Sequence, residues 1–173
     1  MSEFSDVLFF FFDKVILSTN EPGKYDFLKL PVVKDIYTNY GPLSGIHSGL
    51  ANSTTEKNFF LSCDLPLMNK ETIRYIVSYK TEKKIAVPFF NGRTQHLCGV
   101  YSKSIIKEIE ELINNTGDQT SRNGKSIINV KNIIDKIGAE LIRDENSNTF
   151  GQDVFFNMNT PEDYEYVKRK YSQ

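Results

Sequence analysis

The sequence predicts an α/β domain with a mainly parallel sheet that helices cover on both faces. Short β-branched runs alternate along the chain with segments whose apolar residues recur at helical spacing. Several of these runs end on a polar residue followed by a turn, as strands do at the ligand-binding edge of such sheets. The length of 173 residues fits a single domain, 1–173, with one core.

Composition and charge narrow the class of protein. Lys and Arg number 21 against 22 for Asp and Glu, so we expect no nucleic-acid partner and no attraction to an anionic membrane. The most apolar run, 7–12, is about six residues long, whereas a membrane-spanning helix needs about 20. Cys63 and Cys98 follow no disulfide or metal pattern, which predicts reduced core thiols and a cytoplasmic location.

The first elements follow from local patterns. Residues 2–13 are interpreted as the end of a helix or an irregular lead. Two short β-branched strands follow at 14–18 and 30–35, and polar turn formers close the first of them. Gly41-Pro42 forces a turn, after which apolar residues recur at helical spacing as far as Leu50. We therefore expect a helix after this turn.

The middle of the chain continues the alternation. A strand is predicted at 58–63 and a helix at 69–79, which carries its apolar residues on one face. Strands follow at 85–88 and 96–101, and Asn91-Gly92 between them is a strong hairpin signal. These elements predict one strand–helix unit and one hairpin.

The last third ends the pattern with helices. Apolar residues between 105 and 113 predict a long amphipathic helix, and the polar stretch 114–126 predicts a surface loop. Residues 127–142 are expected to form a short helix. Thr160 before Pro161 predicts the capped start of a final helix.

Polar residues follow the first three predicted strands. Asn20 and Asp64 each follow a strand and Asp35 ends one, so each could project into one crevice at the carboxyl edge of the sheet. A carboxylate there, with Pro66 stiffening the chain behind it, suits a hard divalent cation such as Mg²⁺. Asp64 could equally cap the helix that follows, and spacing alone favours neither interpretation.

Six segments together resemble the molybdenum cofactor guanylyltransferases, within the larger sugar-nucleotidyltransferase-like group. In chain order they are VILSTN, LPVVKD, GPLSGIHSGL, FFLSCDLPLM, GRTQHLCGVYSKSI and FFNMNTPEDY. The resemblance implies a three-layer, Rossmann-like nucleotidyltransferase fold with a mostly parallel mixed sheet. It also implies transfer of GMP from GTP to molybdopterin with release of pyrophosphate, Mg²⁺ as cofactor, and molybdoenzymes or cofactor-delivery proteins as possible partners.

The resemblance also implies roles for the residues after the strands. Asn20 and Asp35 match residues that contact the guanine nucleotide. Asp64 matches both a nucleotide contact and the Mg²⁺ ligand, which makes it the expected catalytic residue.

Five further positions match the family but have plain structural alternatives. Gly41 and Gly45 either let the backbone approach the nucleotide or simply form a tight start to a helix. Arg93 either faces the acceptor phosphate or is an exposed hairpin cation. Asn157 and Asn159 match residues near the metal and the acceptor, and by themselves would be interpreted as turn residues.

The start of the chain departs from the family. The family opens with a strand and a glycine-rich loop that cradles the triphosphate, whereas SEFSDVLFFFFDK resembles the end of the helix that follows that loop. We expect the first strand and the loop to be missing, which predicts exposed sheet edges and weak or absent catalysis. His96 is a second departure, because the family commonly has proline there.

These departures leave alternatives for the function. A late start codon, a truncated gene and a degenerate homologue would each explain the missing loop, and a truncated guanylyltransferase is the favoured hypothesis. The alternatives are a catalytically impaired homologue that binds a cofactor or partner, and a related nucleotidyltransferase that uses CTP or a sugar phosphate.

Overall fold

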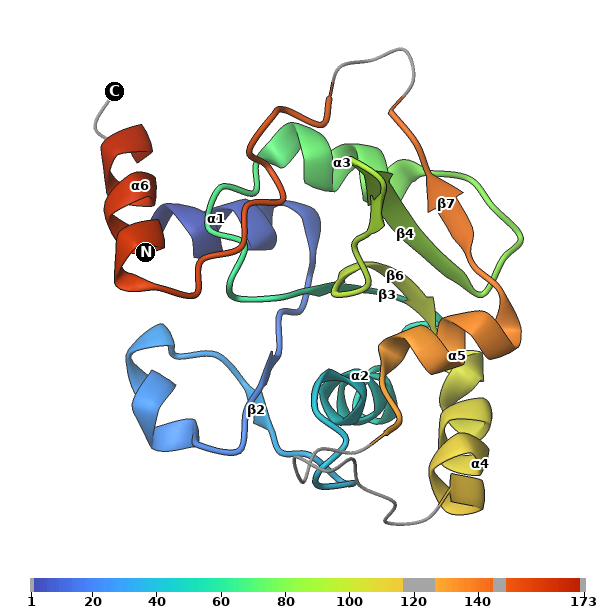
Figure 1. Cartoon of the computed structure of the whole chain (residues 1–173). Helices are drawn as coiled ribbons and strands as arrows, with labels where there is room; N and C mark the ends of the chain where they lie inside the picture. Colours follow the sequence, from blue (N-terminus) through green and yellow to red (C-terminus); the bar gives the residue numbers. More distant parts are fainter. Residues whose placement is uncertain (1, 117–126, 145–148, 172–173) are drawn as a thin grey trace.

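The computed structural model describes residues 2–116, 127–144 and 149–171 of the chain (Figure 1). The helices are α1 (Ser2–Phe11), α2 (Pro42–Ala51), α3 (Lys70–Ser78), α4 (Ile106–Thr116), α5 (Val130–Ile137) and α6 (Pro161–Tyr171), with 3₁₀ turns η1 (Pro22–Leu28) and η2 (Lys103–Ile105). The strands are β1 (Leu17–Ser18), β2 (Val32–Val33), β3 (Lys57–Leu61), β4 (Ile85–Phe90), β5 (Arg93–Thr94), β6 (Cys98–Ser102) and β7 (Glu140–Ile142).

The main sheet is mixed. Its strands lie in the order β3-β6-β4-β5, and β7 pairs with β4. Because β3 and β4 both run antiparallel to β6, they point the same way, and β7 runs parallel to β4. The predicted α/β class is confirmed. The expectation of mainly parallel pairing needs correction, because β6 lies between β3 and β4 and gives each of them an antiparallel neighbour.

A separate two-stranded sheet holds the first two strands. β1 and β2 are parallel, with Leu17 opposite Val32 and Ser18 opposite Val33. No described strand pairs with the second edge of β3, which is therefore an end of the main sheet. The described strands therefore form two separate sheets.

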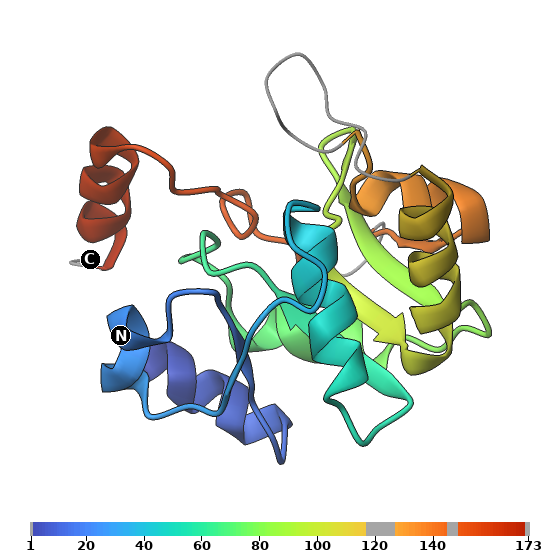
Figure 2. The same ribbon diagram turned by 90° about the horizontal axis from the view of Figure 1, so that it is seen from below.

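Helices cover both faces of the main sheet (Figures 1 and 2). One core cluster joins α2, α4 and α5 to one face, and the other joins α3 and the segment around Phe150 to the opposite face. Strand β4 shows how period-two alternation builds both clusters, because Ile85 and Val87 enter the first and Ala86 enters the second. The result is a three-layer arrangement.

Local signals explain where several elements begin and turn. The Asn69 side chain accepts the backbone N–H of Thr72 at 2.9 Å and caps α3. Asn91 and Gly92 have φ values of 48° and 75°, as the turn of a two-residue hairpin requires. Gly41 precedes Pro42 with φ of 56°, so the turn before α2 uses a backbone conformation that favours glycine.

Several expectations about elements need correction. The region 127–142 is not one helix, because α5 ends at Ile137 and residues 140–142 form β7 beside β4. The lead before β1 is a helix, α1, which is one of the two interpretations that the sequence left open. Helix α4 extends to Thr116 into the expected loop 114–126, most of which lies outside the described residues.

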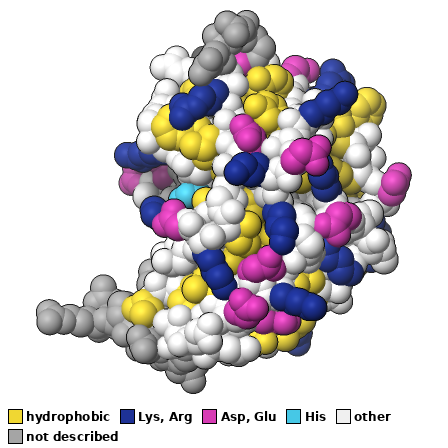
Figure 3. Space-filling view, turned by 90° about the vertical axis from the view of Figure 1, so that its right-hand side faces the viewer, with side chains coloured by type: hydrophobic (Ala, Val, Ile, Leu, Met, Phe, Trp, Pro, Cys, Tyr) yellow, Lys and Arg dark blue, Asp and Glu magenta, His cyan; other side chains and the backbone are white. Residues whose placement is uncertain are grey.

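The surface over α4 and α5 mixes charges of both signs (Figure 3). Ion pairs join Lys84 to Glu108 at 2.7 Å and Lys136 to Glu111 at 3.1 Å. This face therefore offers no broad basic area of the kind that binds nucleic acid. Among the described helices, none has the length and apolar character to cross a bilayer.

Candidate nucleotide and metal site

The carboxyl ends of β1 and β2 bring Asn20 and Asp35 together. The Asn20 side-chain amide donates to Asp35 Oδ2 at 2.8 Å, and its Oδ1 accepts the backbone N–H of Asp35 at 3.0 Å. The reciprocal pair follows from the parallel register of the two strands, which places both ends at one edge. It holds the Asp35 carboxylate in one orientation.

Helix α2 lies against this edge. A Cβ built on Gly45 would lie 3.3 Å from the Ser18 hydroxyl oxygen of β1, so glycine allows close contact between helix and strand. The Ser48 hydroxyl accepts the backbone N–H of Ile36 at 2.9 Å and ties the chain after Asp35 to the same helix. Gly41 has open space around it and precedes the first turn of α2. These positions therefore form one neighbourhood with Asn20 and Asp35.

Asp64 lies in a turn after β3, beside the segment that contains the two late asparagines. The backbone N–H of Met158 donates to the Asp64 carbonyl oxygen at 2.9 Å. On either side of Met158, the Asn159 amide donates to Asn157 Oδ1 at 3.0 Å. The structure thus places Asn157 and Asn159 next to Asp64, although more than 90 residues separate them along the chain.

Asp64 does not cap the next helix, because Asn69 caps α3. Its Oδ1 atom is buried and has no hydrogen-bond partner in the described structure. A buried carboxylate oxygen without a partner is costly unless a cation or donor binds it, so this atom fits a divalent metal. Among the described residues, no cluster of three or more His, Cys, Asp or Glu side chains is arranged to hold a metal ion.

One expected site residue, Arg93, is not tied to these groups. Arg93 is exposed in β5, directly after the Asn91-Gly92 turn. The Asn20–Asp35 pair follows the two-stranded sheet, and the Asp64 turn follows β3 of the main sheet. Helix α2 contacts β1 of the first sheet and β3 of the second. A Cβ on Gly49 of α2 would come within 2.7 Å of the Phe60 ring of β3.

Two site features escaped prediction from sequence. The backbone bond from Met158 to Asp64 joins distant segments, and no local pattern reports it. The second is Ser18, whose contact with Gly45 depends on how α2 packs. The expected cap at Thr160 is confirmed, since its hydroxyl accepts the Asp163 N–H at 3.2 Å.

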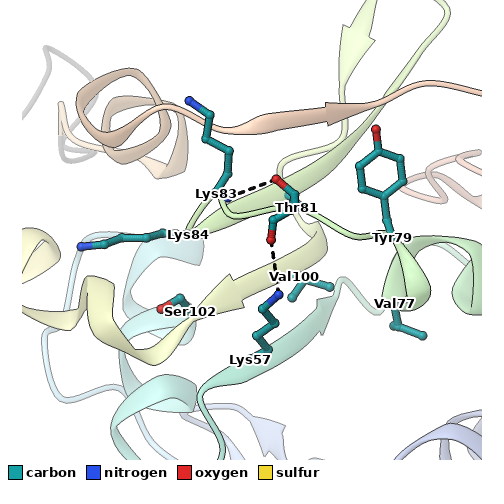
Figure 4. Close-up of a pocket in the computed structure, with 9 residues that line it drawn as sticks. Lys57, Val77, Tyr79, Thr81, Lys83, Lys84, Val100 and Ser102 are labelled. Carbon is teal, nitrogen blue, oxygen red and sulfur yellow. Dashed lines mark hydrogen bonds between the residues drawn. The ribbon is translucent and has the colours of Figure 1, made fainter.

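A small pocket lies at the opposite end of β3 from Asp64 (Figure 4). Lys57 points across it toward the Thr81 carbonyl, at 3.5 Å, while Lys83 and Lys84 extend away. Lys84 pairs with Glu108 at 2.7 Å. None of the predicted site residues lines this pocket.

The two cysteines differ, which corrects the expectation that both lie in the core. Cys98 is buried and burial raises the pKa of its thiol to about 12, whereas Cys63, beside Asp64, is exposed. We expect Ellman's reagent to titrate one thiol in the native protein and two in denaturant. A Cys63→Ser variant should show no native reaction, and two reactive native thiols would contradict the buried position of Cys98.

The layers of the fold define a three-layer α/β protein with polar residues after its strands, as at the ligand-binding edge of such folds. Comparison with known proteins then narrows the class to a family. The model of the MobA-like NTP transferase domain matches residues 5–133, and the chain belongs to this family.

Relatives and solved structures agree with this assignment. A "probable molybdenum cofactor guanylyltransferase" of Clostridium perfringens (strain ATCC 13124) is 34% identical over 92% of this chain and 77% of its own length. A relative of the same name in Carboxydothermus hydrogenoformans is 29% identical over 91% of this chain and 76% of its own length.

A crystal structure of an Aquifex aeolicus VF5 protein matches with a TM-score of 0.70 and 29% identity, over 86% of this chain and 72% of that one. Molybdopterin-guanine dinucleotide biosynthesis protein A of Archaeoglobus fulgidus also matches with a TM-score of 0.70, at 17% identity over 91% of this chain and 78% of that one. The second match supports the fold alone.

Proposed function

We propose that this protein transfers GMP from GTP to molybdopterin in an Mg²⁺-dependent reaction. The observation that carries the proposal is the buried Oδ1 of Asp64, which has no hydrogen-bond partner among the described residues. Asp64 lies in a turn that is hydrogen-bonded to Met158, between Asn157 and Asn159. The names of the relatives support the choice of nucleotide and acceptor.

In this reaction a terminal phosphate oxygen of molybdopterin attacks the α-phosphorus of GTP. A new P–O bond forms, the bond to the β-phosphate breaks, and pyrophosphate leaves. Such a transfer depends on alignment and charge neutralisation more than on covalent help from the protein. Mg²⁺, when bound, would supply positive charge that offsets the negative charge of the reacting phosphates.

Each group of residues has a part in this alignment. Asp64 would hold the metal through its buried Oδ1 atom. Asp35, oriented by Asn20, accepts the N–H groups on the base edge of guanine, which offers neighbouring donors from a ring nitrogen and an amino group. Asn157 and Asn159 contact the acceptor, while Gly41, which has open space around it, lets the backbone at the start of α2 approach the nucleotide.

Calorimetry of Mg²⁺ and GTP, followed by transfer of label from GTP to molybdopterin, tests the proposal. We expect GTP to bind in the presence of Mg²⁺, with CTP and sugar phosphates competing weakly. Asp35→Asn should weaken GTP binding about tenfold and reduce the preference for GTP over CTP, since a hydrogen bond to a charged group contributes about 1.5–3 kcal/mol.

Asp135→Asn is the matched control, because Asp135 lies on α5 and pairs only with Lys131 in the described structure. Its nucleotide affinity should equal that of the unmodified chain. Molybdopterin binding without measurable affinity for GTP would contradict the proposal and favour a cofactor-binding role. Equal affinity for CTP and GTP would remove the guanine assignment.

A further inference from the structure

The chain on both sides of the Asn157–Asn159 segment is anchored. Before the segment, Val154 is buried in the core and the Phe155 ring lies 5.2 Å from that of Phe150, measured between centroids. After it comes α6, which has a single buried residue, Val167. The position of α6 therefore depends on its polar contacts more than on a buried face.

Two side chains of α6 contact Asp153, which lies just before the Asn157–Asn159 segment. The Tyr166 hydroxyl donates to Asp153 Oδ2 at 2.9 Å, and Lys170 Nζ lies 2.9 Å from the same oxygen. Both donors lie on one face of the helix, since they are four residues apart. The hydrogen bonds from Lys170 and Tyr166 lower the pKa of Asp153, so its carboxylate is ionised at neutral pH.

The first turn of α6 is tied to the segment itself. One oxygen of Asp163 accepts the backbone N–H groups of Asn159 and Thr160, each at 2.9 Å. The Tyr166 ring packs on that of Phe156, with centroids 4.8 Å apart. A shift of α6 would consequently move Asn159, and with it the Met158 N–H that donates to Asp64.

We propose that Tyr166 and Lys170 are positioning residues for the acceptor side of the site. By holding Asp153, they fix α6 and keep the Asn157–Asn159 segment beside Asp64. The inference rests on the proposed function for the identity of the acceptor. The contacts between α6 and the Asn157–Asn159 segment are independent of the proposed function.

The test compares two double variants of the full chain. Tyr166→Phe with Lys170→Met removes both donors to Asp153 and keeps the aromatic ring. Tyr164→Phe with Arg169→Met removes the same kinds of group from exposed positions of the same helix. Hydrogen–deuterium exchange reports the Met158 amide, pterin fluorescence reports molybdopterin affinity, and calorimetry reports affinity for Mg²⁺ and GTP.

We expect the first variant to exchange the Met158 amide about tenfold faster and to bind molybdopterin about tenfold more weakly. Its affinity for GTP should stay within about twofold of the control, because the Asn20–Asp35 pair lies on the other sheet. Lys170→Arg combined with Tyr166→Phe should restore most of the protection, since arginine can also donate to the Asp153 carboxylate.

Unchanged exchange at Met158 would overturn the proposal. Faster exchange with unchanged molybdopterin affinity would equally overturn the role on the acceptor side. An unmodified chain that binds molybdopterin but never transfers GMP would contradict the proposed function instead, while the exchange and affinity measurements would still decide the role of Tyr166 and Lys170.

Discussion

Replacing Asp64 with asparagine should lower the rate of guanylyl transfer by about 100- to 1,000-fold. The substitution preserves the shape of the side chain and removes the charge on the buried oxygen that has no hydrogen-bond partner in the described structure. Loss of one preorganised charged group at a reacting centre typically raises the activation free energy by about 3–4 kcal/mol. Label transfer from GTP at saturating Mg²⁺ measures the effect.

The same variant should fold normally. Because Asp64 Oδ1 makes no hydrogen bond within the described protein, asparagine should change the thermal midpoint little. Glu82→Gln is the control, since Glu82 is exposed near the start of β3, at the opposite end from Asp64. Transfer by Asp64→Asn within threefold of this control would exclude Asp64 as the metal ligand.

Replacing Gly99 with alanine should lower the free energy of unfolding more than alanine at any other described glycine, because its added Cβ would make the shortest contact. Gly99 lies in β6, and a Cβ there would come within 2.5 Å of the Ala86 carbonyl oxygen and 2.7 Å of Val87 Cγ1. A backbone oxygen in the adjacent strand cannot move aside without disturbing the β4–β6 pairing. Overpacking of this kind costs about 1–3 kcal/mol or more.

Thermal melting measures the loss. About 3 kcal/mol corresponds to a fall in melting temperature of roughly 6–12 °C for a chain of this size. Gly151→Ala is the matched control, because a Cβ there meets nothing within 4 Å. Equal melting temperatures for the two variants would show that β4 and β6 are not packed as closely as described.

Local patterns were sufficient for much of the fold. The amphipathic period between 105 and 113 predicted α4, and Thr160-Pro161 predicted the start of α6. Asn91-Gly92 predicted the turn after β4, although the strand that follows it directly is β5 and not the expected strand 96–101. Each signal works within a few residues, because helical spacing and turn conformation depend on near neighbours in the chain.

The candidate site was predictable in part for the same reason. Asn20, Asp35 and Asp64 were identified from their places after strands, and the pairing of Asn20 with Asp35 follows from two adjacent parallel strands. The strand pattern left open whether Asp64 is a helix cap. Only the folded chain showed that Asn69 takes that place.

The sequence by itself determined helices α2, α3, α4 and α6 and the polar residues that follow strands, because those properties arise from contacts between near neighbours. The tertiary structure alone decided that β6 lies between β3 and β4, that residues 140–142 form β7, and that Met158 bonds to Asp64. These features join segments far apart in the chain, so they depend on how the layers pack. The two segments that meet in each of these contacts lie too far apart in the chain for a local sequence pattern to include both.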